Sequence, residues 1–194
     1  MRGGVFVSAV CIIPARGGSR RIPRKNIRMF HGKPIIAYSI EAALASNVFM
    51  GVVVSTDDAE VAMWARWLGA SVYKRSFDRG LRGTQEVTAE ALCEMAYKYA
   101  CCIYPTAPLM SVYDLCVGFG LLNRHKDPYT YAVGPDNQDA GQWYWGLSEA
   151  FVGGVPLSEG AKYQVASNRV CDINTEDDWK RAERMYAELH GLTC

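Results

Sequence analysis

Residues 5–13 form an apolar run with little alternation between polar and apolar positions, and the run ends in the turn sequence PARGG at residues 14–18. Such a run predicts a strand that is buried on both faces of a sheet. In open α/β sheets, ligands bind in the crevice beyond the carboxyl ends of the strands. Gly17 and Gly18 would let backbone N–H groups approach an anion there, because no Cβ stands in the way. Residues 11–26 are therefore the stretch around which we expect the fold and its ligand site to be organised.

Residues 16–28, the basic loop, concentrate positive charge in a chain whose formal net charge is only +1. The loop contains no acidic residue and six basic ones, Arg16, Arg20, Arg21, Arg24, Lys25 and Arg28. A solvated loop and a nucleic-acid patch are the two ordinary interpretations of such a run. Two observations argue against both interpretations. The charges are interleaved with turn-forming residues that fix the loop, which are the two glycines, Ser19, Pro23 and Asn26. No second basic cluster extends the positive patch. Neither the Walker motif nor the GxGxxG fingerprint occurs, so we predict a triphosphate site of another type and no nucleic-acid partner.

Composition predicts an ordinary globular protein. A chain of 194 residues can bury one full core, and 49% hydrophobic with 21% charged residues is typical of a single domain. No apolar run approaches membrane-spanning length, and we interpret the apolar start as the first strand instead of a signal peptide, so we expect a cytoplasmic protein. The seven cysteines include no CxxC pair and the three histidines are scattered, which gives little support to a metal or nucleophile site built on either type.

Strand-like and helix-like segments alternate along the chain. Strands are predicted at residues 51–55, 71–74, 100–104 and 129–133, and helices at residues 35–45, from a Thr56 or Asp57 cap to 68, at 84–99 and at 111–124. A capping box of Thr175 and Asp178 begins a last helix. This order predicts an α/β fold with a doubly wound, Rossmann-like, mostly parallel sheet.

Three further features of the sequence have a predicted role. The turn PTAP at residues 105–108 follows the predicted strand 100–104, which places Tyr104 and Thr106 at the same sheet edge as the basic loop. Asp57 and Asp58 suit the first turn of a helix, and we prefer that role to catalysis. Residues 143–145 alternate as an aromatic strand whose rings would be partly core.

The stretch IIPARGGSRRIPRKN, followed by GKPIIAYSIEAAL, resembles the opening of the sugar-acid cytidylyltransferases, which make CMP-activated nonulosonic acids. The resemblance continues through VVVSTDDAEVA, IYPTAPL, DAGQWYWG and CDINTEDDWKRAERMY and covers nearly the whole chain. IYPTAPL and DAGQWYWG are most similar to the pseudaminic acid branch, and the N-acylneuraminate branch is its near neighbour. The resemblance implies a fold of the nucleotide-diphospho-sugar transferase type.

The resemblance also implies a reaction and its residues. CMP would pass from CTP to a nine-carbon, pseudaminic-like sugar acid with release of pyrophosphate, and Mg²⁺ would assist. The nucleotide would contact Ala15, Arg16, Gly17, Gly18, Ser19, Lys25, Asn26, Arg75 and Thr84, and the sugar Tyr104, Thr106, Asp139 and Gln142. The catalytic residues would be Arg16, Lys25 and Asp172.

The chain departs from the family pattern in three places. Relatives carry an Asp-x-Asp metal pair where this sequence has Asp172 and Asn174, so one metal carboxylate is replaced by an amide. The segment SFDRGLRG is basic where relatives are acidic, and only GPDNQ fills residues 134–138, which predicts a shortened dimerisation segment and at most a weak homodimer. Two alternatives stay open: a different sugar nucleotidyltransferase, or a nucleotide-binding relative with impaired catalysis.

Overall fold

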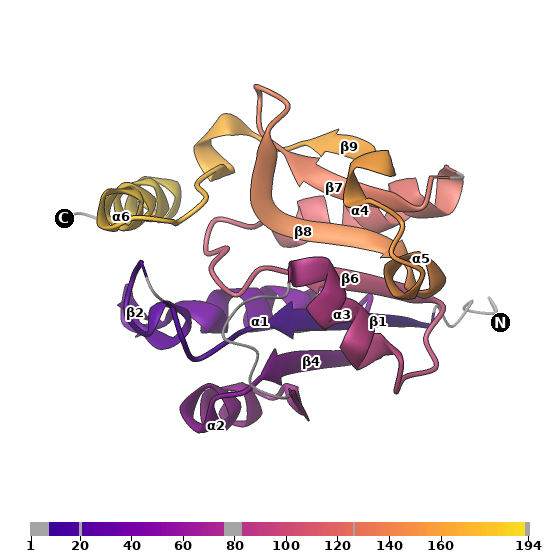
Figure 1. Ribbon diagram of the computed structural model, residues 1–194. Coiled ribbons are helices and arrows are strands. Elements are labelled where there is room, and N and C mark those ends of the chain that lie inside the picture. The colour runs from indigo at the N-terminus through magenta and orange to yellow at the C-terminus, as the bar shows by residue number, and fades with distance from the viewer. Residues whose placement is uncertain (1–7, 20, 76–82, 126, 193–194) are drawn as a thin grey trace, which may run out of the picture.

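The computed structural model describes residues 8–19, 21–75, 83–125 and 127–192, and these pack around one seven-stranded sheet (Figure 1). The strands are β1 (Ala9–Pro14), β4 (Gly51–Thr56), β5 (Ser71–Lys74), β6 (Tyr99–Ile103), β7 (Tyr129–Val133), β8 (Asp139–Leu147) and β9 (Ala161–Gln164). Their order across the sheet is β5-β4-β1-β6-β8-β7-β9. β8 runs antiparallel to both of its neighbours and every other pair is parallel, which confirms the predicted mostly parallel sheet.

Six α-helices accompany the described strands. They are α1 (Ile35–Ser46), α2 (Ala59–Trp67), α3 (Thr84–Leu92), α4 (Val112–Arg124), α5 (Ser148–Val152) and α6 (Glu176–His190). Short 3-10 turns lie at Lys25–Ile27, Leu157–Glu159 and Ser167–Arg169, and β2 (Met29–Phe30) pairs with β3 (Lys33–Pro34) in a small hairpin.

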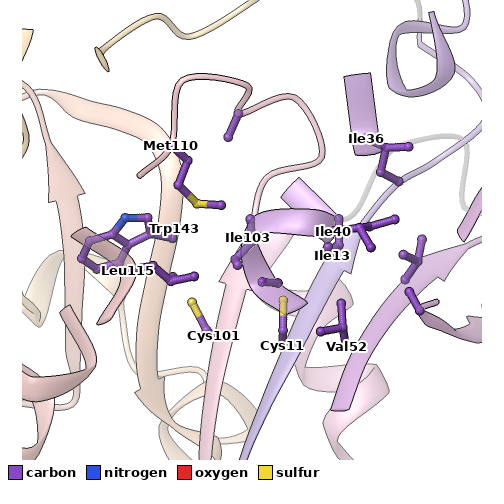
Figure 2. Close-up of a cluster of buried hydrophobic side chains, with 14 of the residues drawn as sticks. Cys11, Ile13, Ile36, Ile40, Val52, Cys101, Ile103, Met110, Leu115 and Trp143 are labelled. Atoms are coloured by element: carbon purple, nitrogen blue, oxygen red, sulfur yellow. The ribbon is translucent and has the colours of Figure 1, made fainter. Parts of the chain in front are cut away.

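β1 is buried on both faces, as its apolar run predicts. Cys11 and Ile13 belong to one core cluster, which also contains residues of α1, α2 and α4, while Val10 and Ile12 belong to a second cluster with residues of α3 and α5. The sheet is therefore covered by helices on both sides, and Figure 2 shows the first cluster, with Cys11 and Cys101 on adjacent strands. Of the predicted strand, residues 5–7 lie outside the described part of the chain and Ser8 precedes β1.

A third cluster fastens the C-terminal segment to the basic loop. It joins Ile22 and Phe30 to Ile173 and Trp179, and all four side chains are almost completely buried. α6 begins at the predicted capping box, in which the Thr175 side chain accepts from the Asp178 amide. In Figure 1, α6 lies at the end of the sheet toward which the arrowheads of β1 and β4 point. This packing brings residues from the two ends of the sequence to one edge of the sheet.

Several predicted boundaries are wrong. The cap of α2 is Asp58, whose carboxylate accepts from two backbone amides, and neither Thr56 nor Asp57 takes that role. The predicted helix 84–99 ends at Leu92, because the chain must turn before β6 begins at Tyr99. Residues 143–145 belong to β8, which extends to both sides, and Trp143 and Trp145 are fully buried core residues. β9, α5 and the β2–β3 hairpin were not predicted.

Among the described residues, no helix combines the length and the apolar character needed to cross a bilayer.

Candidate active site

A cavity of about 470 Å³ opens beyond the carboxyl ends of β1 and β6. Its volume falls within the range of ordinary small-molecule pockets. The lining comes from three segments that are far apart in the sequence: the end of β1 with the basic loop, the start of α3 with Arg75, and the turn after β6. The lining residues are Pro14, Arg16, Ser19, Arg21, Lys25, Asn26, Arg75, Gly83, Thr84, Val87, Tyr104, Pro105 and Thr106.

The cavity brings together eight of the residues predicted for the site. Arg16, Ser19, Lys25, Asn26, Arg75 and Thr84 come from the nucleotide set, and Tyr104 and Thr106 from the sugar set. Sequence reasoning missed five lining residues, which are Pro14, Arg21, Gly83, Val87 and Pro105. Arg21 was visible as a member of the basic loop, whereas nothing in the sequence distinguishes Val87 from the other apolar positions of α3.

The basic loop is held in place by hydrogen bonds to its neighbours. The Gly17 amide donates to the Asp57 carboxylate at 2.9 Å, and the Asn26 side chain donates to the Arg16 carbonyl at 2.9 Å. A Cβ at Gly17 would lie 2.4 Å from the Asp58 carboxylate, so the close approach of α2 requires glycine here. The Gly17 amide, which we expected to face an anion, is thus directed at Asp57, and Gly17, Gly18 and Ala15 are not among the lining residues.

The positive charge of the loop divides into a structural part and a part at the cavity. Arg24 pairs with Asp58 at 3.1 Å and with Glu60 at 2.5 Å. Arg28 pairs with Glu176 at 2.6 Å, and its guanidinium lies 4.4 Å from the Trp179 ring centre.

These two arginines fasten the loop to α2 and α6 and are not among the residues that line the cavity. Arg16, Arg21 and Lys25 line the cavity together with Arg75, and Arg20 lies outside the described residues. The expectation of six uncompensated charges was wrong, because acids from distant segments pair with two of them.

Lys25 connects the basic loop to the C-terminal segment. Its Nζ donates a 2.6 Å hydrogen bond to the Ile173 carbonyl, across 148 residues of sequence. Burial lowers the pKa of Lys25, and the nearby Asp172 carboxylate opposes that shift, which places Asp172 close to the ammonium. The cavity therefore has a lysine whose position is fixed by the segment that carries the predicted metal residues.

Asp172 and Asn174 lie together, as two residues in an extended segment should. The Asn174 side-chain amide donates to the Asp172 carboxylate, and the Asn174 backbone amide donates to Asp178 at 3.1 Å. No group of three or more His, Cys, Asp or Glu side chains in the described part of the chain could hold a metal ion. Asp172 is exposed and Asn174 half-buried, so a carboxylate and an amide oxygen remain accessible, which are the hard oxygen ligands that Mg²⁺ prefers when substrate phosphates complete its shell.

The remaining sugar-set residues lie on β8, beyond the cavity lining. Gln142 is buried, its Nε2 donates to the Arg169 carbonyl at 2.6 Å, and its Oε1 has no hydrogen-bond partner among the described residues. Asp139 is exposed and accepts from the Tyr144 hydroxyl and from the Gly141 amide. Gly141 has a φ of +64°, and a Cβ there would lie 3.2 Å from the Asp172 side chain. β8 thus passes close to Asp172.

Comparison with known proteins identifies relatives of this chain. The chain is 31% identical, over 225 residues covering 93% of this chain and 97% of the relative, to the pseudaminic acid cytidylyltransferase of Campylobacter jejuni subsp. jejuni serotype O:2. That length exceeds the 194 residues of this chain, so the relative carries segments that this chain lacks.

Two solved structures share the fold. One is a CMP:2-keto-3-deoxy-manno-octonic acid synthetase in complex with CTP, with a TM-score of 0.77, 16% identity and coverage of 94% of this chain and 99% of that chain. The other is Rv0371C of Mycobacterium tuberculosis H37Rv in complex with manganese, with a TM-score of 0.67, 13% identity and coverage of 92% and 98%. The cytidylyltransferase family profile matches residues 10–136, which include β1, the basic loop and the turn after β6. The chain belongs to the cytidylyltransferase family.

Proposed function

We propose that this protein transfers the cytidylyl group of CTP to a nonulosonic acid of the pseudaminic type and releases pyrophosphate. The observation that carries the proposal is the cavity itself, where cations of the basic loop face the polar turn after β6. The relative that aligns over nearly the whole chain is a pseudaminic acid cytidylyltransferase, which supports this choice of acceptor.

The chemistry suits the side chains that are present. A hydroxyl of the sugar acid attacks the α-phosphate, the new O–P bond forms, and the bond to pyrophosphate breaks. Such a displacement depends on positioning and on neutralising charge at the phosphates, and it needs no covalent intermediate. Arg16, Arg21 and Lys25 supply positive charge on one side of the cavity, while Ser19 and Thr84 supply hydroxyl groups.

A divalent ion would complete this neutralisation. Asp172, with Asn174 beside it and the triphosphate as the other ligand, would hold Mg²⁺, which polarises the phosphoryl oxygens. Lys25 keeps the segment in register through its bond to Ile173. Replacement of the second carboxylate by an amide removes one negative charge from the metal site, so metal affinity should be lower than in a site with two carboxylates.

A second candidate function is nucleotide binding without turnover, and Asn174 is the observation that favours it. One assay distinguishes cytidylyl transfer from nucleotide binding without turnover. The protein is incubated with each of the four nucleoside triphosphates, candidate nonulosonic acids and a range of Mg²⁺ and Mn²⁺ concentrations. Mass spectrometry of the products should reveal a CMP-sugar with CTP only. CTP binding with no CMP-sugar under any condition would favour the binding protein, and product from another nucleotide would change the assigned base.

We further propose that the short connection between β7 and β8 weakens the assembly of the protein. Residues 134–138 span the two strands as a tight turn, in which the Gly134 amide donates to the Gln138 carbonyl at 2.8 Å. This turn leaves no long arm that could extend from the β7–β8 connection toward a second subunit. We expect at most a weak homodimer, and light scattering that shows a tight dimer at micromolar concentration would contradict it.

A further inference from the structure

Four arginines in the described part of the chain are at least half-buried, and they are Arg16, Arg28, Arg75 and Arg169. Arg16 and Arg75 line the cavity, and Arg28 pairs with Glu176. Arg169 has neither role, because it is not among the lining residues and no acidic side chain in the described ranges forms an ion pair with it. A half-buried guanidinium is rarely left without an anion, since taking its charge out of water costs free energy that a partner must offset.

Arg169 is held against the turn that follows β6. Its Nη1 donates to the Leu109 carbonyl at 3.3 Å, and Leu109 lies three residues after Thr106, which lines the cavity. The Arg169 carbonyl accepts from the Gln142 side chain at 2.6 Å. The Gln142 carbonyl in turn accepts from the amide of Tyr104, another lining residue, at 2.8 Å. The side chain and the backbone of Arg169 are therefore both tied to the segment that forms one wall of the cavity.

The guanidinium keeps donors for a ligand. Arginine presents several N–H groups in a planar fork that matches a carboxylate, and Leu109 is the one hydrogen-bond acceptor of the Arg169 side chain among the residues that the structure describes. Arg181, on the other side of Asp172 in the sequence, is already engaged, because it pairs with Asp178 at 3.5 Å. Arg169 is thus better suited than Arg181 to receive an anion from a ligand.

An acid acceptor brings such an anion. A nonulosonic acid carries a carboxylate on the carbon that bears its anomeric hydroxyl, and carboxyl groups are ionised at neutral pH. This acceptor must approach a triphosphate, so the two negative charges repel each other unless a cation stands beside the carboxylate. The proposed function assigns the lining cations Arg16, Arg21 and Lys25 to the phosphates. Arg169 is a further cation, and it precedes the proposed metal ligand Asp172 by three residues.

We propose that Arg169 binds the carboxylate of the acceptor and thereby selects a sugar acid over a neutral sugar. This inference rests on the proposed cytidylyl transfer. Because the anomeric hydroxyl is attached next to the carboxylate, a fork that holds the carboxylate also restricts the orientation of the attacking oxygen. Arg169 is therefore a specificity-determining residue of the acceptor, separate from the cations that serve CTP.

Arg169→Met tests the assignment with two acceptors, a pseudaminic-type acid and its primary carboxamide, which is neutral and similar in shape. The substitution removes the guanidinium and leaves the backbone carbonyl that Gln142 binds. The wild-type enzyme should prefer the acid in kcat/KM by about 10- to 100-fold, the range of a hydrogen bond to a charged group. Arg169→Met should lose this preference with an unchanged KM for CTP, and Arg169→Lys, which keeps the charge without the fork, should retain part of it. Arg124→Met, at an exposed arginine that ends α4, is the control of equal charge change and should behave as wild type.

Two kinetic results would overturn the carboxylate site while the proposed function stands. One is a preference for the acid that persists in Arg169→Met, and the other is a raised KM for CTP in that variant, which would assign Arg169 to a phosphate. If Arg169→Met does not fold, the wild-type enzyme still decides the question, because equal use of the acid and the carboxamide would exclude a carboxylate site.

A binding measurement separates this inference from the proposed transfer. Each acceptor is titrated by calorimetry into the CTP-bound protein without a divalent metal. Tighter binding of the acid that Arg169→Met loses, together with no CMP-sugar from the wild-type protein at any metal concentration, would overturn the proposed transfer and support the carboxylate site. CMP transfer by the wild-type protein with equal affinities for the acid and the carboxamide would overturn the carboxylate site alone.

Discussion

The Lys25 ammonium donates a 2.6 Å hydrogen bond to the backbone carbonyl of Ile173, which joins the basic loop to the segment that carries Asp172. Ile173 is fully buried in one apolar cluster with Ile22 of the basic loop. This packing holds in place both segments that the Lys25–Ile173 hydrogen bond joins. The basic loop and the segment that carries the proposed metal residues are thus joined into one unit, although they lie near opposite ends of the chain. A change in one of them should be felt in the other.

Arg16→Ala and Lys25→Ala should each weaken CTP binding. Each removes a cation from the cavity wall, and a charge-assisted hydrogen bond contributes about 1.5 to 3 kcal/mol. Calorimetric titration with CTP measures the loss, and Arg66→Ala, an exposed arginine on α2, serves as the control of equal charge. Unchanged affinity in both cavity variants would place the nucleotide elsewhere.

The same titration should depend on pH through Lys25. Burial lowers its pKa from the ordinary 10.5, so the ammonium loses its charge at a lower pH than an exposed lysine does. As the pH rises through the pKa of Lys25 in the folded protein, CTP affinity should fall. Lys25→Arg stays charged over this range and should show a flatter profile; equal profiles would exclude Lys25 as the titrating group.

Gly17→Ala should damage the site and the fold together. The added Cβ would lie 2.4 Å from the Asp58 carboxylate, which caps α2, so either the loop or the helix start must move. Overpacking of this kind costs about 1 to 3 kcal/mol. Gly18→Ala is the matched control, because its Cβ would meet no atom within 4 Å. Thermal denaturation should show a lower Tm for Gly17→Ala only. Equal Tm values for the two variants would mean that the loop moves to accommodate the added Cβ at no cost in stability.

Gln142→Ala should raise the KM for the sugar acid and leave the KM for CTP nearly unchanged. Gln142 is buried on β8, away from the basic loop, and its Oε1 has no partner among the described residues, so a sugar hydroxyl or acylamino group could satisfy it. Steady-state kinetics with each substrate varied in turn gives both constants. Gln164→Ala is the control, because Gln164 also donates to a backbone carbonyl but lies exposed on β9. Equal effects of Gln142→Ala on both substrates would indicate a structural role.

Asn174→Asp should lower the Mg²⁺ concentration needed for half-maximal rate. In the wild-type protein the Asn174 amide donates to Asp172, whereas in the variant two carboxylates would lie side by side and attract a cation. Asp172→Ala should abolish turnover with the fold intact, which circular dichroism can verify. The outcome that would contradict the metal assignment is an unchanged Mg²⁺ dependence in Asn174→Asp together with full activity in Asp172→Ala.

The sequence predicted the frame of the fold because its strands are short, apolar and regularly spaced. Residues 51–55, 71–74 and 129–133 are strands where expected, and α1 and α4 match to within one residue. Of the two glycines in α4, Gly118 packs against Trp143, since a Cβ there would lie 2.3 Å from the indole ring. Gly120 has no such neighbour, so close packing explains only one of the two glycines.

The predictions failed where contacts between residues far apart in the sequence determine the role of a side chain. Asp57 and Asp58 are equally good capping residues by sequence, whereas in the structure Asp58 caps α2 and Asp57 accepts from the distant Gly17 amide. Likewise, no local pattern shows that Arg24 and Arg28 pair with acids 34 and 148 residues away, while Arg16 and Lys25 face the cavity. The hydrogen bond from the Tyr144 hydroxyl to Asp139 on the same strand accompanies a register shift between β7 and β8, which the alternation of residues 143–145 does not reveal.

The central claim is cytidylyl transfer, and its most direct test follows the phosphates. CTP radiolabelled at the α-phosphate, or separately at the γ-phosphate, is incubated with the protein, Mg²⁺ and a pseudaminic-type acid. We predict that the α-label appears in a CMP-sugar and the γ-label in pyrophosphate, at equal rates and only when the acid is present. If both labels stay in CTP, or if CTP is hydrolysed at the same rate without the acid, the protein is not a cytidylyltransferase for this class of acceptor.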